Sequence, residues 1–273
     1  MAALSGKRIS VKTKIRHRNE INNTFSALPL SARRILFMAM AQLDSKSLLR
    51  SGQMFKITAK EYAAIAAVDL SVAYKQMKDG AEQLQISLIK IPKSKLLQPE
   101  MKEISQSDAV WQLNLTDFCS YSEKESSIIL SFGRTIEPYI CQLKDNYTTQ
   151  VLFSAVRLSD TNASSLYQLI RKYISAGNDK SFDIEIDELK EQLSLYKESN
   201  GIKTYLYPDF KIFNRAFLKK NVAVISESTE IKNLTVDVIA KIERRASKLR
   251  FSYQVDKESE GQDYRIPKGF RGA

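Results

Sequence analysis

The chain of 273 residues carries 42 lysines and arginines against 31 acidic residues, a formal net charge of +11, and its hydrophobic content of 43% is enough to bury a core. This charge favours a polyanionic partner, either nucleic acid or an anionic membrane surface. No apolar run is long enough to span a bilayer and no signal peptide is visible, so the sequence predicts a cytoplasmic protein without a membrane-spanning segment.

The first predicted elements follow a basic segment. Residues 6–19, GKRISVKTKIRHRN, lack an apolar core and are interpreted either as an arm that lies on phosphates or as a disordered tail. Periodic apolar residues then predict a helix over 28–43, with Ser31 as its N-cap, and a short strand follows over 54–58.

A helix and a turn are expected over 58–71, where Thr58 and Glu61 have the spacing of a capping box. The next helix, over 70–84, has two chemically distinct faces. Its apolar stripe consists of Leu70, Ala73, Met77, Ala81 and Leu84. Its polar stripe consists of Ser71, Tyr74, Lys75 and Lys78. A polar helix face is often no more than a solvated surface, so its role depends on the elements around it.

Alternating residues predict strands over 85–91, 111–116 and 127–132, with a polar loop over 92–109. The resulting order is helix, strand, helix, turn, helix and hairpin. This order is typical of a winged helix-turn-helix domain, in which the last helix enters a DNA groove.

The same order of elements begins again at residue 158. The predicted elements are a helix over 158–174, a strand over 181–186, a helix over 187–196 starting at Asp187, a loop around Gly201, a helix over 207–225 with Pro208 near its first turn, and strands over 233–243 and 248–255. In the helix over 207–225, the residues expected to face inward are Phe210, Phe213, Phe217 and Val224. Those expected to face outward are Lys211, Asn214, Arg215 and Lys219.

The repeated order predicts an α+β fold of two tandem winged helix-turn-helix domains, one over 1–145 for DNA binding and dimerisation and one over 146–273 for most of the sequence-specific DNA binding. A weak internal identity supports the duplication. The aligned pairs are Phe55 with Phe182, Ile57 with Ile184, and Glu61 with Glu188.

The outward residues of the second copy have the chemistry of base recognition. Arginine bonds guanine O6 and N7 bidentately, and asparagine pairs with adenine N6 and N7, which suits Arg215 and Asn214 to the major groove. The polar stripe of the first copy suits phosphates and one base contact, so we expect the second helix to carry more of the specificity. Two such helices in successive grooves would let one monomer cover roughly 20 bp.

Two further clusters are expected to act as wings. The segment 243–248, ERRASK, places Arg244, Arg245 and Lys248 where cations can reach a neighbouring phosphate backbone or minor groove. Lys93 and Lys95 are the corresponding candidates in the first copy. Each cluster taken singly is equally consistent with a solubilising turn.

Several long segments closely resemble the plasmid replication initiators of the Rep superfamily, most closely the pi-type initiators, over about residues 10 to 255. The segments are KTKIRHRNEINNTFSALPLSARRILFMAMAQLDSK, SVAYKQMKDGAEQL, RTIEPYI, SSLYQLIRKY, DELKEQL and YPDFKIF. The chain departs from this pattern in the 92–109 loop, at Lys211, and in residues 256–273, which lack the longer tail of pi-type relatives.

The resemblance implies two winged-helix domains without enzymatic activity. As monomers, initiators of this family bind repeated origin sites (iterons), help to open an adjacent AT-rich region, and recruit the host initiator DnaA and the replicative helicase. As dimers, they bind an inverted repeat at their own promoter, repress it and limit plasmid copy number. The family's dimer surface would here include the 28–50 region, and its DNA-reading positions fall on the two outward helix faces.

Two alternatives remain open. A dedicated transcriptional regulator would need the same two helices. A rolling-circle relaxase would nick DNA through one of the twelve tyrosines, but such an enzyme holds its metal with a histidine pair, and His17 is the single histidine. Cys119 and Cys141 have no metal-type spacing and are expected to be free thiols. The glycines form no nucleotide-binding motif, so we expect no metal, no cofactor and no catalytic residue.

Overall fold

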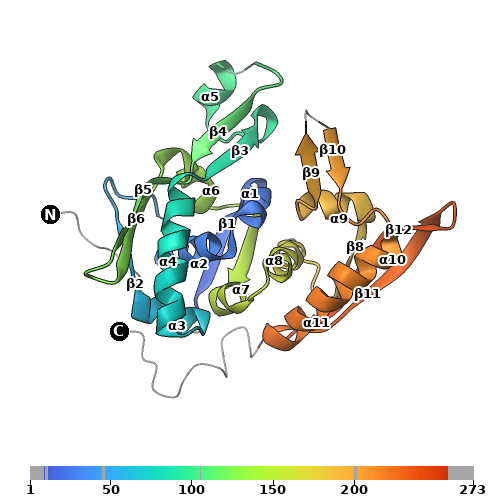
Figure 1. The fold of residues 1–273 in the computed structure, drawn as a ribbon. Coiled ribbons are helices and arrows are strands. Elements are labelled where there is room, and N and C mark those ends of the chain that lie inside the picture. Colours follow the sequence, from blue (N-terminus) through green and yellow to red (C-terminus); the bar gives the residue numbers. More distant parts are fainter. Residues whose placement is uncertain (1–8, 10–11, 45–46, 105, 200–201, 258–273) are drawn as a thin grey trace.

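The computed structural model describes residues 9, 12–44, 47–104, 106–199 and 202–257 (Figure 1). The elements of the first half are β1 (Lys14–Arg18), the 3-10 turn η1 (Asn19–Ile21), α1 (Asn22–Ala27), α2 (Leu30–Met40), β2 (Phe55–Thr58), α3 (Ala59–Ala66), α4 (Leu70–Gln85), β3 (Leu88–Pro92), the 3-10 turn η2 (Lys93–Lys95), α5 (Pro99–Ile104), β4 (Val110–Asn114), β5 (Thr116–Ser122), β6 (Ser127–Phe132), the 3-10 turn η3 (Arg134–Ile136) and α6 (Glu137–Ile140). Those of the second half are β7 (Tyr147–Val151), α7 (Leu152–Arg157), α8 (Thr161–Ser175), β8 (Ser181–Glu185), α9 (Ile186–Gln192), β9 (Tyr196–Ser199), β10 (Ile202–Tyr205), α10 (Phe210–Phe213), the π-helical η4 (Asn214–Leu218), α11 (Lys219–Ser228), β11 (Ile231–Ile242) and β12 (Arg245–Val255).

Two three-stranded antiparallel sheets have the same topology. The strand order is β2-β6-β5 in the first sheet and β8-β12-β11 in the second. In each sheet, one strand comes before the two helices of the helix-turn-helix and pairs with a hairpin that comes after them. A helix precedes each sheet, α2 in the first half and α8 in the second. The aligned residues Phe55 and Phe182 are both buried in these strands. The predicted α+β fold of two winged-helix units is confirmed.

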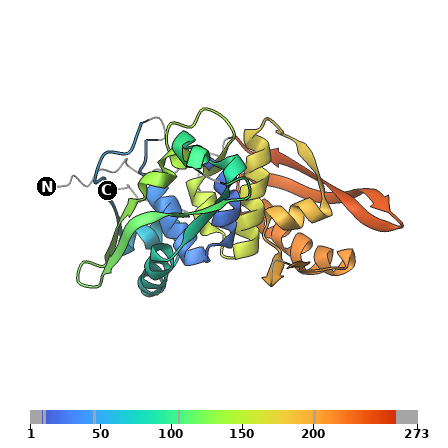
Figure 2. The same ribbon diagram turned by 90° about the horizontal axis from the view of Figure 1, so that it is seen from above.

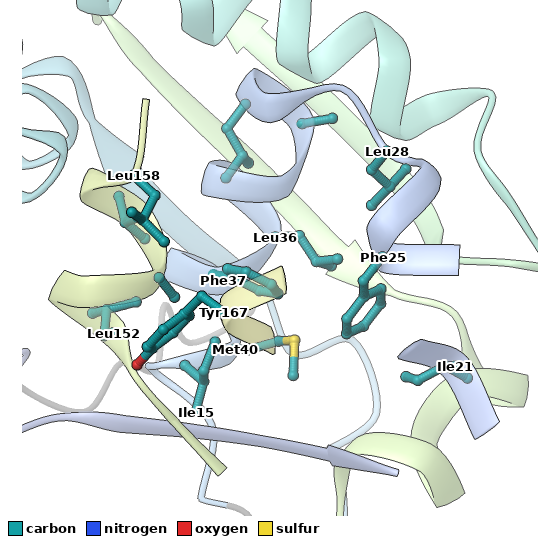
Figure 3. Packing of buried hydrophobic residues seen from close by; sticks show 14 of the residues in the cluster. Ile15, Ile21, Phe25, Leu28, Leu36, Phe37, Met40, Leu152, Leu158 and Tyr167 are labelled. Carbon is teal, nitrogen blue, oxygen red and sulfur yellow. The ribbon is translucent and has the colours of Figure 1, made fainter. Parts of the chain in front are cut away.

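The core of the first unit is built around α2. All residues from 32 to 40 of this helix are buried, because α4, α7 and β1 pack around it. Figure 3 shows Leu36, Phe37 and Met40 of α2 among Phe25 of α1 and Tyr167 of α8. Because α2 is a central helix, the part of the 28–50 region that it forms offers little surface to a partner.

The start of α2 differs from the prediction. The expected N-cap, Ser31, is wrong: α2 begins at Leu30, and Pro29 stands before it without a side-chain cap. The separate helix α1 precedes Pro29 and was not predicted. The cause is Pro29 itself, because the residue before a proline avoids helical angles, and Leu28 is extended with φ −67° and ψ 141°.

Part of the basic N-terminal segment belongs to the folded body. Strand β1 pairs antiparallel with β7, and His17 within it is 0% exposed. Interpreting all of 6–19 as an arm or a tail is therefore wrong for residues 14–18. Residues 6–8 and 10–11 of the segment lie outside the described residues.

Two predicted loops contain regular structure. The 92–109 segment holds η2 and α5, and the residues around Gly201 follow β9 and precede β10, which pair as a hairpin; 105, 200 and 201 lie outside the described residues. The strand β5 was also missed. These elements are short and polar, so their sequences carry little periodic signal.

The boundary expected between 145 and 146 stays a prediction. Just beyond it, β7 pairs with β1, and α8 packs against α1, α7 and β7 on one side and α11 on the other (Figure 1). One cluster of buried side chains runs through both units. The cysteines Cys119 and Cys141 are free, as predicted. Within the described residues, none of the helices combines the length and the apolar composition that a bilayer-spanning segment requires.

Candidate nucleic-acid interface

A tight helix-turn-helix positions α4. The predicted capping box is confirmed: the Thr58 hydroxyl accepts from the Glu61 amide at 3.3 Å, and the Thr58 amide donates to the Glu61 carboxylate at 2.8 Å. At the other end of α3, Ala67 adopts a left-handed φ of 53°, which ends the helix. Helix α4 then leaves the turn with Asp69 as its N-cap.

The apolar face of α4 is confirmed except at its first member. The side chains of Ala73, Met77, Ala81 and Leu84 are at most 3% exposed, whereas Leu70 is 39% exposed. Leu70 is the first residue of the helix. On the buried face, Gly80 permits a close approach, because a Cβ built there would lie 2.5 Å from Cδ1 of Ile35.

The polar face of α4 is turned outward. Ser71, Lys75 and Lys78 are exposed, and Tyr74 is half-buried against the core. Nζ of Lys78 lies 3.2 Å from Oε1 of Glu123, and this hydrogen bond raises the pKa of Lys78. Because both partners are exposed, solvent screens the pair, and a phosphate can replace the carboxylate at low cost.

The second candidate helix runs through α10, η4 and α11. It begins at Phe210 with Asp209 as its N-cap, whose carboxylate accepts from the amides of Lys211 and Ile212 at 2.7 and 3.2 Å. Pro208 precedes the cap directly, near the first turn as predicted. The helix ends at Ser228, three residues beyond the predicted end.

A π turn interrupts this helix at Asn214–Leu218. The Lys219 amide donates to the Asn214 carbonyl five residues earlier, which widens the turn by one residue. Phe213 and Phe217 are fully buried as predicted, but after the π turn the buried position moves from Val224 to Ile225. Phe210, the remaining residue expected to face inward, is half-buried.

The outward residues of this helix lie at or beside the π turn. The exposed ones are Lys211, Arg215 and Lys219, and the half-buried one is Asn214. Each has the length and donor chemistry that base edges or phosphates require.

The hairpin β11–β12 forms a long wing beside α10 (Figure 1). Glu243 and Arg244 make its turn, both at positive φ, 47° and 67°. Arg244 and Arg245 are exposed at the tip, whereas Lys248 is half-buried, with Nζ 3.5 Å from Oε1 of Glu185. A groove of about 960 Å³ separates the wing from α10. Its charged lining residues are Lys190, Lys211, Lys241, Arg244, Arg245, Glu185, Asp187 and Asp209.

Lys93 and Lys95 lie apart from the first wing. They form η2, directly after β3, and β3 pairs with β4 in a two-stranded sheet that is separate from the sheet β2-β6-β5. The hairpin equivalent to β11–β12 is β5–β6, whose turn carries Lys124, exposed between Glu123 and Glu125. A contact of Lys93 or Lys95 with DNA stays a prediction.

Helix α4 and the α10–α11 helix lie on the same side of the molecule. Figure 2 shows both along one edge, with the tip of β11–β12 beyond the second helix. The helix that carries Tyr74 and the helix that carries Arg215 therefore do not lie at opposite ends of the molecule. Sequence reasoning missed Lys124, because the strand β5 had to be placed before this lysine could be assigned to a wing. It also missed Lys241, although the predicted strand over 233–243 contains this residue.

Two family profiles match the chain. The profile described as initiator replication protein, WH1, matches residues 14–171, and that described as initiator Rep protein, WH2, matches residues 185–253. The PI protein of Escherichia coli is 42% identical over 261 residues, which cover 92% of this chain and 85% of the relative. A crystal structure of the Pi initiator protein in complex with iteron DNA is similar with a TM-score of 0.84 and 43% identity, covering 91% of this chain and 100% of that one.

Proposed function

Because the chain belongs to the initiator replication protein family, we propose that it is a plasmid replication initiator that binds the iterons of its own origin through both winged-helix units. The observation that carries the proposal is the placement of α4 and the α10–α11 helix on one side of the molecule (Figure 2). A similar chain in complex with iteron DNA supports it. The role is binding and assembly in the bacterial cytoplasm, without catalysis.

The two helices have different tasks in this proposal. Lys211, Asn214 and Arg215 read base edges in one major groove, and Lys219 contacts phosphate. The polar face of α4 anchors the protein in the next groove through Ser71, Tyr74, Lys75 and Lys78. The β11–β12 wing adds phosphate contacts through Arg244, Arg245 and Lys248, because cations at a hairpin tip reach the adjacent backbone.

The binding test uses DNA with direct repeats from the replicon that encodes the chain. Purified protein should produce one gel-shift step per repeat, and scrambled DNA of equal length should give none at the same concentration. A double variant, Asn214→Ala with Arg215→Ala, should lose this preference. The matched control is Lys144→Ala, which removes an exposed cation outside both helix-turn-helix units and both wings. Equal binding of repeats and scrambled DNA by the wild type would refute the proposal.

Its finer elements follow from the family. We propose that the monomer promotes opening of an AT-rich region and recruits DnaA and the replicative helicase. As a dimer, the protein represses its own gene and limits copy number. Among the described residues of the 28–50 region, the large apolar side chain exposed for self-association is Leu48, which is 60% exposed after α2.

A dedicated repressor remains the competing function. A host that supplies this chain alone should maintain a plasmid whose sole origin is the repeat-bearing fragment. Repression of the promoter without replication of that plasmid would favour the repressor. Leu48→Lys, which places a charge at the proposed dimer contact, should weaken repression and leave monomer binding to a single repeat unchanged.

A further inference from the structure

Residues 154–160, from the middle of α7 to the cap of α8, are bonded to both DNA-facing units. On the first side, Arg34 of α2 is 3% exposed and donates from Nε to the Val156 carbonyl at 2.8 Å and from Nη2 to the Leu158 carbonyl at 3.4 Å. Its Nη1 donates to Oε1 of Gln76 at 2.7 Å. The same Gln76 oxygen accepts from the Tyr62 hydroxyl at 2.9 Å. Arg34 thus joins 154–160 directly to α4.

The first helix of the helix-turn-helix is held as well. Arg157, which is 8% exposed, donates from Nε to the Ile65 carbonyl at 3.0 Å and from Nη2 to the Ala64 carbonyl at 3.3 Å. These carbonyls stand at the C-terminal end of α3, where a cation is favourable to the helix dipole. Its guanidinium lies 5.0 Å from the ring centroid of Phe153. Both helices of the first unit therefore depend on this segment for their orientation.

On the second side, the carboxylate of Asp160 has two roles. Oδ1 accepts from the Asn162 amide at 2.8 Å and caps α8, and Oδ2 lies 2.7 Å from Nζ of Lys220 in α11. Buried Glu230, between α11 and β11, accepts from the Ser154 hydroxyl at 2.6 Å and from the Tyr167 hydroxyl at 2.8 Å. Residues 154–160 thus hold the second DNA-facing helix too.

We propose that residues 154–160, with Arg34 and Asp160 as positioning residues, set the number of base pairs between the two DNA segments that α4 and the α10–α11 helix contact. This inference rests on the proposed function. It adds the spacing between the two contacted DNA segments to the features of the DNA site that the protein recognises. One inserted base pair moves one segment by about 3.4 Å and turns it by about 35° relative to the other. Residues 154–158 are buried, and a buried, hydrogen-bonded segment in a close-packed interior cannot follow that change without breaking bonds.

The test compares three duplexes. A footprint on one repeat from the chain's own replicon first locates the two contacted segments. Duplexes then carry the native spacing, one added base pair or one deleted base pair midway between them. The measurement is the ratio of dissociation constants for altered and native spacing, which cancels any general change in DNA affinity.

Two variants loosen the segment. Arg34→Met keeps the volume and removes every donor, and Asp160→Asn keeps the cap acceptor and removes the charge that pairs with Lys220. A third, Leu130→Ala, is the matched control, because it destabilises the core at β6, where Leu130 pairs with Phe55 of β2 and Cys119 of β5, outside residues 154–160.

We expect the wild type and Leu130→Ala to bind the altered duplexes at least tenfold more weakly than the native one, and both loosened variants to reduce that ratio at least threefold. If Arg34→Met does not fold, Asp160→Asn decides the question. Ratios equal to the wild type in the loosened variants would overturn the inference, as would a wild type that ignores spacing. Absence of binding to the native duplex would instead overturn the proposed function.

Discussion

The buried ion pair between α8 and the junction of α11 with β11 offers a quantitative test of the fold. Nη1 of Arg171 lies 2.9 Å from Oε1 of Glu230, and their side chains are 3% and 1% exposed. The Glu230 carboxylate also accepts from Tyr167 and Ser154, and Nε of Arg171 donates to the Thr149 carbonyl at 2.8 Å. Glu230→Gln keeps the shape and removes the charge.

This change should lower the free energy of unfolding by about 3–5 kcal/mol, because it leaves the Arg171 guanidinium buried without its anion. A whole domain is stabilised by about 5–15 kcal/mol, so the loss is a large fraction of the total. In urea, with a slope of about 1–3 kcal/mol per molar, the unfolding midpoint should fall by more than about 1 M.

Circular dichroism of urea unfolding measures this loss. The matched control is Glu125→Gln, whose partner Nζ of Lys56 lies 2.8 Å away on the surface, and its midpoint should stay close to that of the wild type. In a double-mutant cycle with Arg171→Met, the two single losses should add up to more than the loss of the double variant. Equal midpoints for Glu230→Gln and Glu125→Gln would refute the reasoning.

Three further outcomes are expected. Gly80→Ala should destabilise the protein by about 1–3 kcal/mol in thermal or urea unfolding, because the added Cβ would clash with Ile35. This loss should outweigh the higher helix propensity of alanine. A more stable variant would show that α2 and α4 can move apart to accept the added Cβ. Burial lowers the pKa of His17 to about 4 from 6.5, so that on acidification the unfolded chain binds a proton before the folded chain does. The free energy of unfolding should therefore fall by about 3 kcal/mol as the pH drops from 6.5 to 4. His17→Gln should remove this pH dependence between pH 5 and 6.5, and an unchanged pH profile would contradict the role given to His17. In a site library, Arg215→Ala should relax the choice of one base at a cost of about 1–3 kcal/mol, whereas Lys78→Ala should weaken binding to all sequences and lower the salt slope by about 1; identical behaviour would contradict the division between reading and anchoring helices.

The features that the sequence alone determined are those carried by neighbouring residues. The capping box of Thr58 and Glu61, the buried stripe of α4 from Ala73 to Leu84, and the exposed turn at Arg244 depend on residues two to four positions apart. Such interactions form within one turn of chain, and the pattern of apolar residues records them directly. The repeated order of these elements was enough to predict two winged-helix units and a DNA-facing role.

Other features were decided only by contacts between distant segments. The pairing of β6 with β2 and β5 makes β5–β6 the first wing and leaves Lys93 and Lys95 in a turn next to a separate sheet. The π turn at Asn214–Leu218 shifts the buried register, and the arginines Arg34 and Arg157 are buried between elements that are far apart in sequence. A strand's partner and a long side chain's environment depend on which surfaces meet in the folded chain, and local periodicity carries no information about that choice.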